Sequence, residues 1–100
     1  LGLLGLCTKA GDICFGTDAC IDLFLRKKVK LIIVAQDASE RTKRNLEFVC
    51  KENDIKIIFF GTIEEISRAI GKDNKAVIGI KNKNFALEIE KIINGGEIIG

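Results

Sequence analysis

Three short, nearly continuous apolar runs most constrain how this chain can fold. They are LIIVA at 31–35, IKIIFF at 55–60 and AVIGI at 76–80. Runs of this length fit central β-strands that are covered on both faces. Helical patterns lie between them, one capped by Ser39 and running to about residue 52, and one opened by the Thr62/Glu65 capping-box pair and ending at residue 70. The alternation predicts an α/β fold, a three-layer α/β/α sandwich around a small mixed sheet.

The remaining patterns complete one such unit. Helices are expected over 1–10, 17–28 and 83–93, with Gly11 closing the first, and a short strand over 13–15. A turn at 95–96 and a final edge strand at 98–99 are also expected. The chain has 100 residues, of which 47% are hydrophobic, which is enough for one core. We therefore expect a single domain over residues 1–100.

Charge and cysteine usage narrow the class of protein. The net charge of +2 is too small to indicate nucleic-acid binding, and each basic cluster, at 26–30 and 41–44, taken alone is typical of a solvated helix face. The four cysteines form no CxxC motif and there is no histidine, so we expect buried free thiols and no metal or cofactor. Free thiols favour a reducing compartment, the cytoplasm.

No apolar run approaches the ~20 residues that span a bilayer, so we expect no membrane association. Because the sequence starts at Leu1 and lacks Met, we expect residues to precede it.

Catalytic patterns are weak. The chain has no histidine base, no GxGxxG and no P-loop lysine motif. Cys20 falls on an apolar helix face, where inert packing is favoured over reactivity. Asp37 follows a buried strand but has no acidic neighbour there, so it is better interpreted as bonding loop amides or opening the next helix. We expect no enzyme, although a small-molecule or phosphoryl-binding domain using Asp37 remains an alternative.

A helix start at Gly16, Thr17 and Asp18 offers a different kind of site. Free backbone N–H groups and the helix dipole make such a start attractive to anions, and nearby lysines at 27, 28 and 30 could contact phosphates. There are six Phe and neither Tyr nor Trp, which argues against a platform that stacks single-stranded bases. Recognition of folded RNA by shape is the remaining mode.

Four segments together resemble a known family. They are LGLLGLCTKAGDICFG at the start, GTDACIDLFLRKKVKLIIVAQDAS, IKIIFFGTIEEISRAIGK and AVIGIKNKNFA. In order and spacing they resemble the L7Ae/L30e ribosomal protein family, and most closely its small bacterial YlxQ-type branch. The resemblance covers nearly the whole chain. It implies an α/β/α sandwich that binds kink-turn or similarly bent RNA, usually within a ribonucleoprotein.

The resemblance also implies which positions would contact RNA. The family motif starts with Gly at Gly16 and often continues x-Asn-Glu-x-x-Lys; here Asp18, Ala19 and Asp22 stand at those three positions. Lys30 matches the residue before the strand, Asp37 the acidic residue after it, and the loop leading into 76–80 the second contact region. The expected RNA contacts are Gly16, Thr17, Asp18, Lys27, Lys28, Lys30, Asp37, Lys72, Lys75 and Ala76.

The leading interpretation is therefore a non-enzymatic, ribosome-associated protein. The resemblance implies that its partner is structured RNA, either ribosomal RNA or the ribosome, and we expect no DNA partner. A second interpretation rests on Ala19 and Asp22. Alanine cannot form the hydrogen bonds of glutamate, and aspartate directs a negative charge at a polyanion. Such a member could have lost specific RNA recognition and act as a protein-interaction module.

Overall fold

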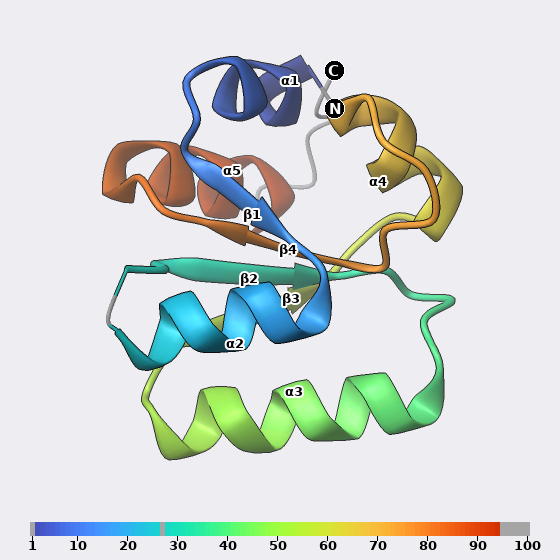
Figure 1. Ribbon diagram of the computed structural model, residues 1–100. Helices are drawn as coiled ribbons and strands as arrows, with labels where there is room; N and C mark the ends of the chain where they lie inside the picture. The colour runs from blue at the N-terminus through green and yellow to red at the C-terminus, as the bar shows by residue number, and fades with distance from the viewer. Residues whose placement is uncertain (1, 27, 95–100) are drawn as a thin grey trace.

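A computed structural model describes residues 2–26 and 28–94. Along the chain the elements are α1 (Gly2–Lys9), β1 (Ile13–Phe15), α2 (Thr17–Leu25), β2 (Leu31–Val34), α3 (Glu40–Glu52), β3 (Lys56–Phe59), α4 (Ile63–Ile70), β4 (Val77–Ile80) and α5 (Lys83–Asn94) (Figure 1). The predicted alternation of helices and strands is confirmed. The turn and strand predicted at 95–99 lie outside the described residues.

Helix α2 is three residues shorter than predicted. It ends at Leu25, and the backbone N–H of the capping residue Arg26 donates to the carbonyls of Asp22 and Phe24. Beyond it, the N–H of Lys28 donates to the carbonyl of Leu23 at 2.9 Å. The chain turns here because Val29, only 2% exposed, is inserted into the core ahead of β2. One apolar residue within the basic run thus decides where the helix stops.

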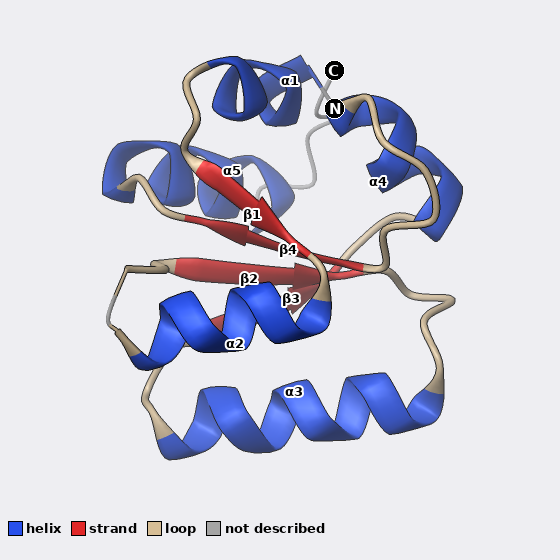
Figure 2. Ribbon diagram, viewed as in Figure 1, coloured by secondary structure: helices blue, strands red, loops and turns tan. Residues whose placement is uncertain are grey.

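The four strands form one mixed sheet in the order β1-β4-β2-β3. Strands β2 and β3 are parallel, and β4 runs antiparallel to both β1 and β2. Helices α2 and α3 cover one face, and α1, α4 and α5 cover the other (Figure 2). The three-layer α/β/α sandwich with a small mixed sheet is therefore confirmed.

The core lies on both sides of β2, whose four residues are all buried. Side chains from both helical layers contribute to this core. Burying each large apolar side chain adds roughly 1.5–3 kcal/mol to the stability of the fold. The four cysteines are buried and free, as predicted. None of the described helices is both long enough and apolar enough to cross a membrane. The largest fully buried helical side chains are Leu4, Phe24, Leu46, Ile66 and Ile89.

This topology gathers several loops at one edge of the sheet. Strands β1, β2 and β3 run in the same direction and end at this edge, whereas β4 begins there. Helices α2, α3 and α4 therefore all start at this edge, on the right in Figure 1, and the α4–β4 loop returns to it. We call it the helix-start edge. Residues 28–30 lie at the opposite edge, where β2 begins.

Candidate nucleic-acid interface

Two of the three helices that start at this edge have their N-termini capped by side chains. At α4, Thr62 Oγ1 accepts from the N–H of Glu65 at 3.1 Å, and a Glu65 carboxylate oxygen accepts from the N–H of Thr62 at 3.0 Å. Asp37 Oδ1 accepts from the N–H of Ile63 at 2.8 Å. These bonds occupy amides that would otherwise attract an anion.

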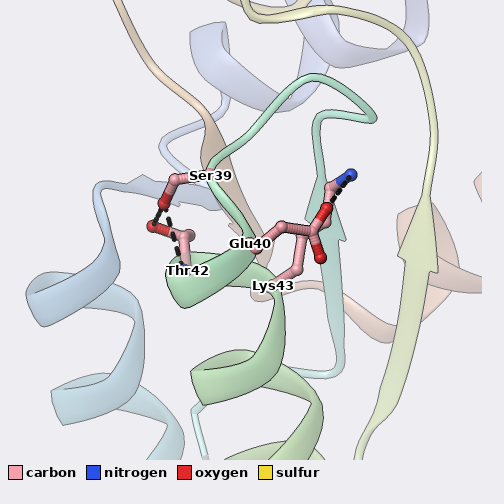
Figure 3. Close-up of polar contacts among 4 residues, drawn as sticks. All are labelled: Ser39, Glu40, Thr42 and Lys43. Carbon is pink, nitrogen blue, oxygen red and sulfur yellow. Dashed lines mark hydrogen bonds and ion pairs between the residues drawn. The ribbon is translucent and has the colours of Figure 1, made fainter.

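Helix α3 is closed in a similar way. Ser39 Oγ accepts from the N–H of Thr42 at 3.1 Å and donates to Thr42 Oγ1 at 2.8 Å (Figure 3). In the same turn the Glu40 carboxylate lies 3.7 Å from Lys43 Nζ. The cap and the acidic side chain together offset the positive end of the helix dipole.

Helix α2 alone among these three starts without a side-chain cap in the described part of the chain. Its N-cap is Gly16, at φ 94° and ψ 144°, a conformation that favours glycine. The Gly16 N–H donates to the carbonyl of Val77 at 2.9 Å, and its carbonyl accepts from Cys20 N–H at 3.1 Å. The first-turn amides therefore remain available, and the absence of a Cβ lets a ligand come close to the backbone.

A buried serine fixes the α4–β4 loop to helix α4. Ser67, the one buried polar residue among those described, accepts from the N–H of Lys75 through Oγ at 2.7 Å. Its carbonyl accepts from the N–H of Lys72 at 2.9 Å, and the carbonyl of Ala76 accepts from Ala35 N–H at 2.8 Å. The backbone of residues 72–76 is thus fixed relative to the sheet.

Two loop lysines lie over the aromatic ring of the residue that precedes Gly16. The Nζ atoms of Lys72 and Lys75 are 5.2 and 5.4 Å from the centroid of the Phe15 ring. These are cation–π distances. Two positive charges therefore lie over the last side chain of β1, at the helix-start edge.

Seven of the ten predicted RNA contacts come together at the helix-start edge, and two do not. Lys28 and Lys30 are exposed at the opposite edge, where the Lys30 N–H donates to the carbonyl of Ile80 at 2.8 Å. The nine residues of α2 separate them from Gly16, a length of about 14 Å. Lys27 is outside the described residues. The seven at the helix-start edge are Gly16, Thr17, Asp18, Asp37, Lys72, Lys75 and Ala76.

An open hollow of about 610 Å³ lies beside Asp37. Its size would suit a small ligand, but several of its polar groups already bind one another. Asp37 is bonded to α4, Ser67 to Lys75, and the Arg68 guanidinium pairs with the Glu64 carboxylate. These bonds hold the loops together and occupy polar groups that a small molecule would otherwise contact. Asp37 is expected from the sequence to bond loop amides or to open the next helix. It instead accepts from the first amide of α4, Ile63, and so helps to open α4 and not α3.

The exposed side of α2 is acidic. Asp18 and Ala19 are exposed in the first turn, and the Asp22 carboxylate lies 3.5 Å from the Arg26 guanidinium. Such an exposed pair contributes little to stability, about 0.3–0.5 kcal/mol. The exposed face of α2 therefore carries two carboxylates, those of Asp18 and Asp22.

The thiols of Cys14 and Cys20 lie below the β1–α2 turn, 3.0 Å apart. Their hydrogen bond and burial raise the pKa of Cys20 far above its usual range, and the same bond lowers the pKa of Cys14. Cys20 therefore stays protonated and packs as an apolar side chain, in agreement with the interpretation of its sequence position.

Sequence reasoning missed Phe15 and Ser67. A signal for Ser67 was present, because its position shares the inward face of α4 with Ile66 and Ile70, and a buried hydroxyl there needs a partner. Phe15 gave no such signal, since its lysines are 57 and 60 residues away and meet it only after folding.

Comparison with known proteins gives a consistent result. The model of the ribosomal protein L7Ae/L30e/S12e/Gadd45 family matches residues 2–89. The chain is 32% identical over 95 residues to the RNA-binding protein YlxQ of Enterococcus faecium, covering 95% of this chain and 91% of that protein. It is 24% identical over 92 residues to YlxQ of Bacillus subtilis, covering 92% of each.

Solved structures share the fold. A protein of unknown function from Bacillus halodurans C superposes with a TM-score of 0.90 at 30% identity, over 93% of this chain and 94% of that one. The Giardia lamblia 15.5kD RNA binding protein superposes with a TM-score of 0.78 at 21% identity, over 94% and 83% of the two chains. At that identity the second match bears on the fold alone.

Proposed function

The chain belongs to the ribosomal protein L7Ae/L30e/S12e/Gadd45 family, and from that premise we propose that it is a non-enzymatic RNA-binding protein. The names of its YlxQ relatives support RNA as the partner. The observation that carries the proposal is the uncapped start of α2 beside Lys72 and Lys75. Backbone amides and two ammonium groups at one edge of the sheet suit phosphates of folded RNA.

The finer proposal is that the RNA is a kink-turn or a similarly bent helix, bound as part of a ribosome-associated particle. A sharp bend brings phosphates of two helical segments close together, which matches a concentrated positive spot better than a straight duplex does. Lys28 and Lys30, one helix length away, then contact phosphates of a flanking stem.

A mobility-shift titration tests this proposal. A kink-turn RNA is compared with an unbent duplex of the same length and base composition, at several salt concentrations. We expect tighter binding of the bent RNA, and an affinity that falls as salt rises because each phosphate contact releases counterions. Equal and weak binding of both RNAs would remove the claim of kink-turn recognition.

A matched variant locates the contact. Lys72→Gln with Lys75→Gln removes two charges but keeps the polar side chains. It should reduce the salt slope by roughly one to two units and weaken binding to the bent RNA. Lys9→Gln with Lys91→Gln removes the same charge from helices α1 and α5, on the other face of the sheet from α2, and should change the slope less.

The second candidate function is a protein-interaction module, and the acidic surface of α2 favours it. Ala19 and Asp22 are both exposed, so neither is held by the core and each can be exchanged freely. Ala19→Glu with Asp22→Lys restores the family residues at both positions. If they alone had removed RNA recognition, this double variant gains affinity for the kink-turn and its salt slope rises by about one unit. No gain would show that other positions have diverged as well.

A further inference from the structure

The Phe15 ring occupies an unusual position, below two ammonium groups that come from a distant loop. Phe15 is the last residue of β1 and is half-buried, and Lys72 and Lys75 belong to the α4–β4 loop. Both Nζ atoms lie within 5.4 Å of the ring centroid. Neither lysine forms a salt bridge in the described ranges 2–26 and 28–94. Both ammonium groups are therefore in cation–π range of one ring and in no salt bridge among the described residues.

Two like charges near one point repel each other, and free lysine side chains spread into solvent. The negative face of an aromatic ring attracts an ammonium group, which offsets part of this repulsion. It also restricts the many rotamers of lysine before a ligand arrives. Such preorganisation increases affinity because less order is lost on binding.

The backbone on both sides of this contact is fixed. Phe15 pairs with Ile78 in the β1–β4 ladder, and the N–H of Lys75 is bonded to Ser67 Oγ. Gly16, next to the ring, donates to the carbonyl of Val77. Replacing the ring should therefore release the lysine side chains without moving the loop.

We propose that Phe15 is a positioning residue, which holds the ammonium groups of Lys72 and Lys75 together at the helix-start edge for contact with RNA backbone phosphates. The inference rests on the proposed function, to which it adds a residue that itself need not touch the RNA. A leucine at this position keeps an apolar side chain in the core but has no negative face to offer.

The test compares three single variants by kink-turn affinity and by the salt slope of that affinity. Phe15→Leu should weaken binding about tenfold and lower the slope by roughly one unit. Phe15→Trp keeps the cation–π contact and should bind within about threefold of the unmodified protein. Phe48→Leu is the matched control, because Phe48 on α3 is 65% exposed, and it should change neither the affinity nor the salt slope.

Two further measurements separate positioning from general damage to the fold. In a Lys72→Gln, Lys75→Gln background, Phe15→Leu should cost no further affinity, because the cations it positions are gone. In the RNA-free protein, ring currents should shift the side-chain methylene NMR signals of Lys72 and Lys75 upfield, and Phe15→Leu should abolish these shifts. Phe15→Trp also introduces the only indole of a chain without Trp or Tyr, so its fluorescence should respond to RNA.

The outcomes are distinguishable. Equal affinity and slope for Phe15→Leu and the unmodified protein, with the bent RNA still preferred, would overturn the positioning role and leave the proposed function standing. A further loss of affinity in the doubly substituted background would also overturn it, since Phe15 would then act through another group. If the unmodified protein binds no RNA at all, both the function and the role fall together.

Discussion

Gly79 in β4 lies where there is no room for a methyl group. It pairs with Cys14 on one side and Ile32 on the other. A Cβ built at this position would be 2.6 Å from Cys14 Sγ, 3.1 Å from Val29 Cγ1 and 3.4 Å from Cys20 Sγ. These three neighbours are all buried, so none can move into solvent. Gly79→Ala therefore overpacks the centre of the fold, directly below the β1–α2 turn.

The size of the effect follows from two opposing contributions. Overpacking a well-filled core costs about 1–3 kcal/mol, and the shortest distance here places the cost toward the upper end. Replacing glycine by alanine recovers roughly 0.4–1 kcal/mol by restricting the unfolded chain. The net loss in the free energy of unfolding should be about 2 kcal/mol, or on the order of 10 °C in Tm for a chain of this length.

Urea unfolding followed by far-ultraviolet circular dichroism measures this loss. Cys14→Ala removes the sulfur atom nearest to the added methyl group, so the double variant should be less destabilised than the sum of the two single variants. The interaction free energy should favour the double variant by at least about 1 kcal/mol. An additive result, or a Gly79→Ala protein as stable as the original, would refute the packing described around this glycine.

Three further predictions concern stability and the far end of the interface. Burial raises the pKa of Cys7 and of Cys50 to about 11 from 9.0. The stability that each thiol contributes is fully present below pH 9 and is lost, up to about 2–3 kcal/mol each, as the pH rises toward 11. In urea titrations from pH 8 to 11, the stability of a Cys7→Ala, Cys50→Ala variant should therefore decline less steeply than that of the unmodified protein, and parallel curves would contradict this. Asp37→Ala removes the acceptor of the Ile63 N–H and should lower the free energy of unfolding by about 1 kcal/mol; no change would mean that water replaces the carboxylate. Lys28→Ala with Lys30→Ala should weaken binding of a kink-turn RNA with long flanking stems more than binding of one with short stems. Equal losses of affinity in gel-shift titrations would show that these lysines do not contact the flanking stem.

Much of the fold could be predicted because its signals are local. The apolar runs of β2 and β4, the Ser39 cap and the Thr62/Glu65 capping box each depend on residues close together in the chain. The end of α2 could not be predicted well, because the decisive event is the burial of Val29 within a basic run. Nothing local in RKKVK shows that the fourth residue belongs to the core.

The candidate site was predictable only in part, for a related reason. The sequence pattern indicated a helix start at Gly16, and the resemblance to the family implied the loop that carries Lys72 and Lys75. That Lys28 and Lys30 lie at the other edge follows from the direction of α2, and the contact of Phe15 with Lys72 and Lys75 follows from strand pairing across the whole chain. Such contacts between distant residues leave no periodic pattern for sequence reasoning to use.

The most direct test of where folded RNA binds is a titration of isotopically labelled protein with a kink-turn RNA, followed by backbone amide NMR. We predict that the largest shifts occur at residues 16–19, the start of α2, and at residues 72–76, the loop that carries both lysines. Small shifts there, together with large ones confined to the outer face of α3 or to α1 and α5, would contradict it.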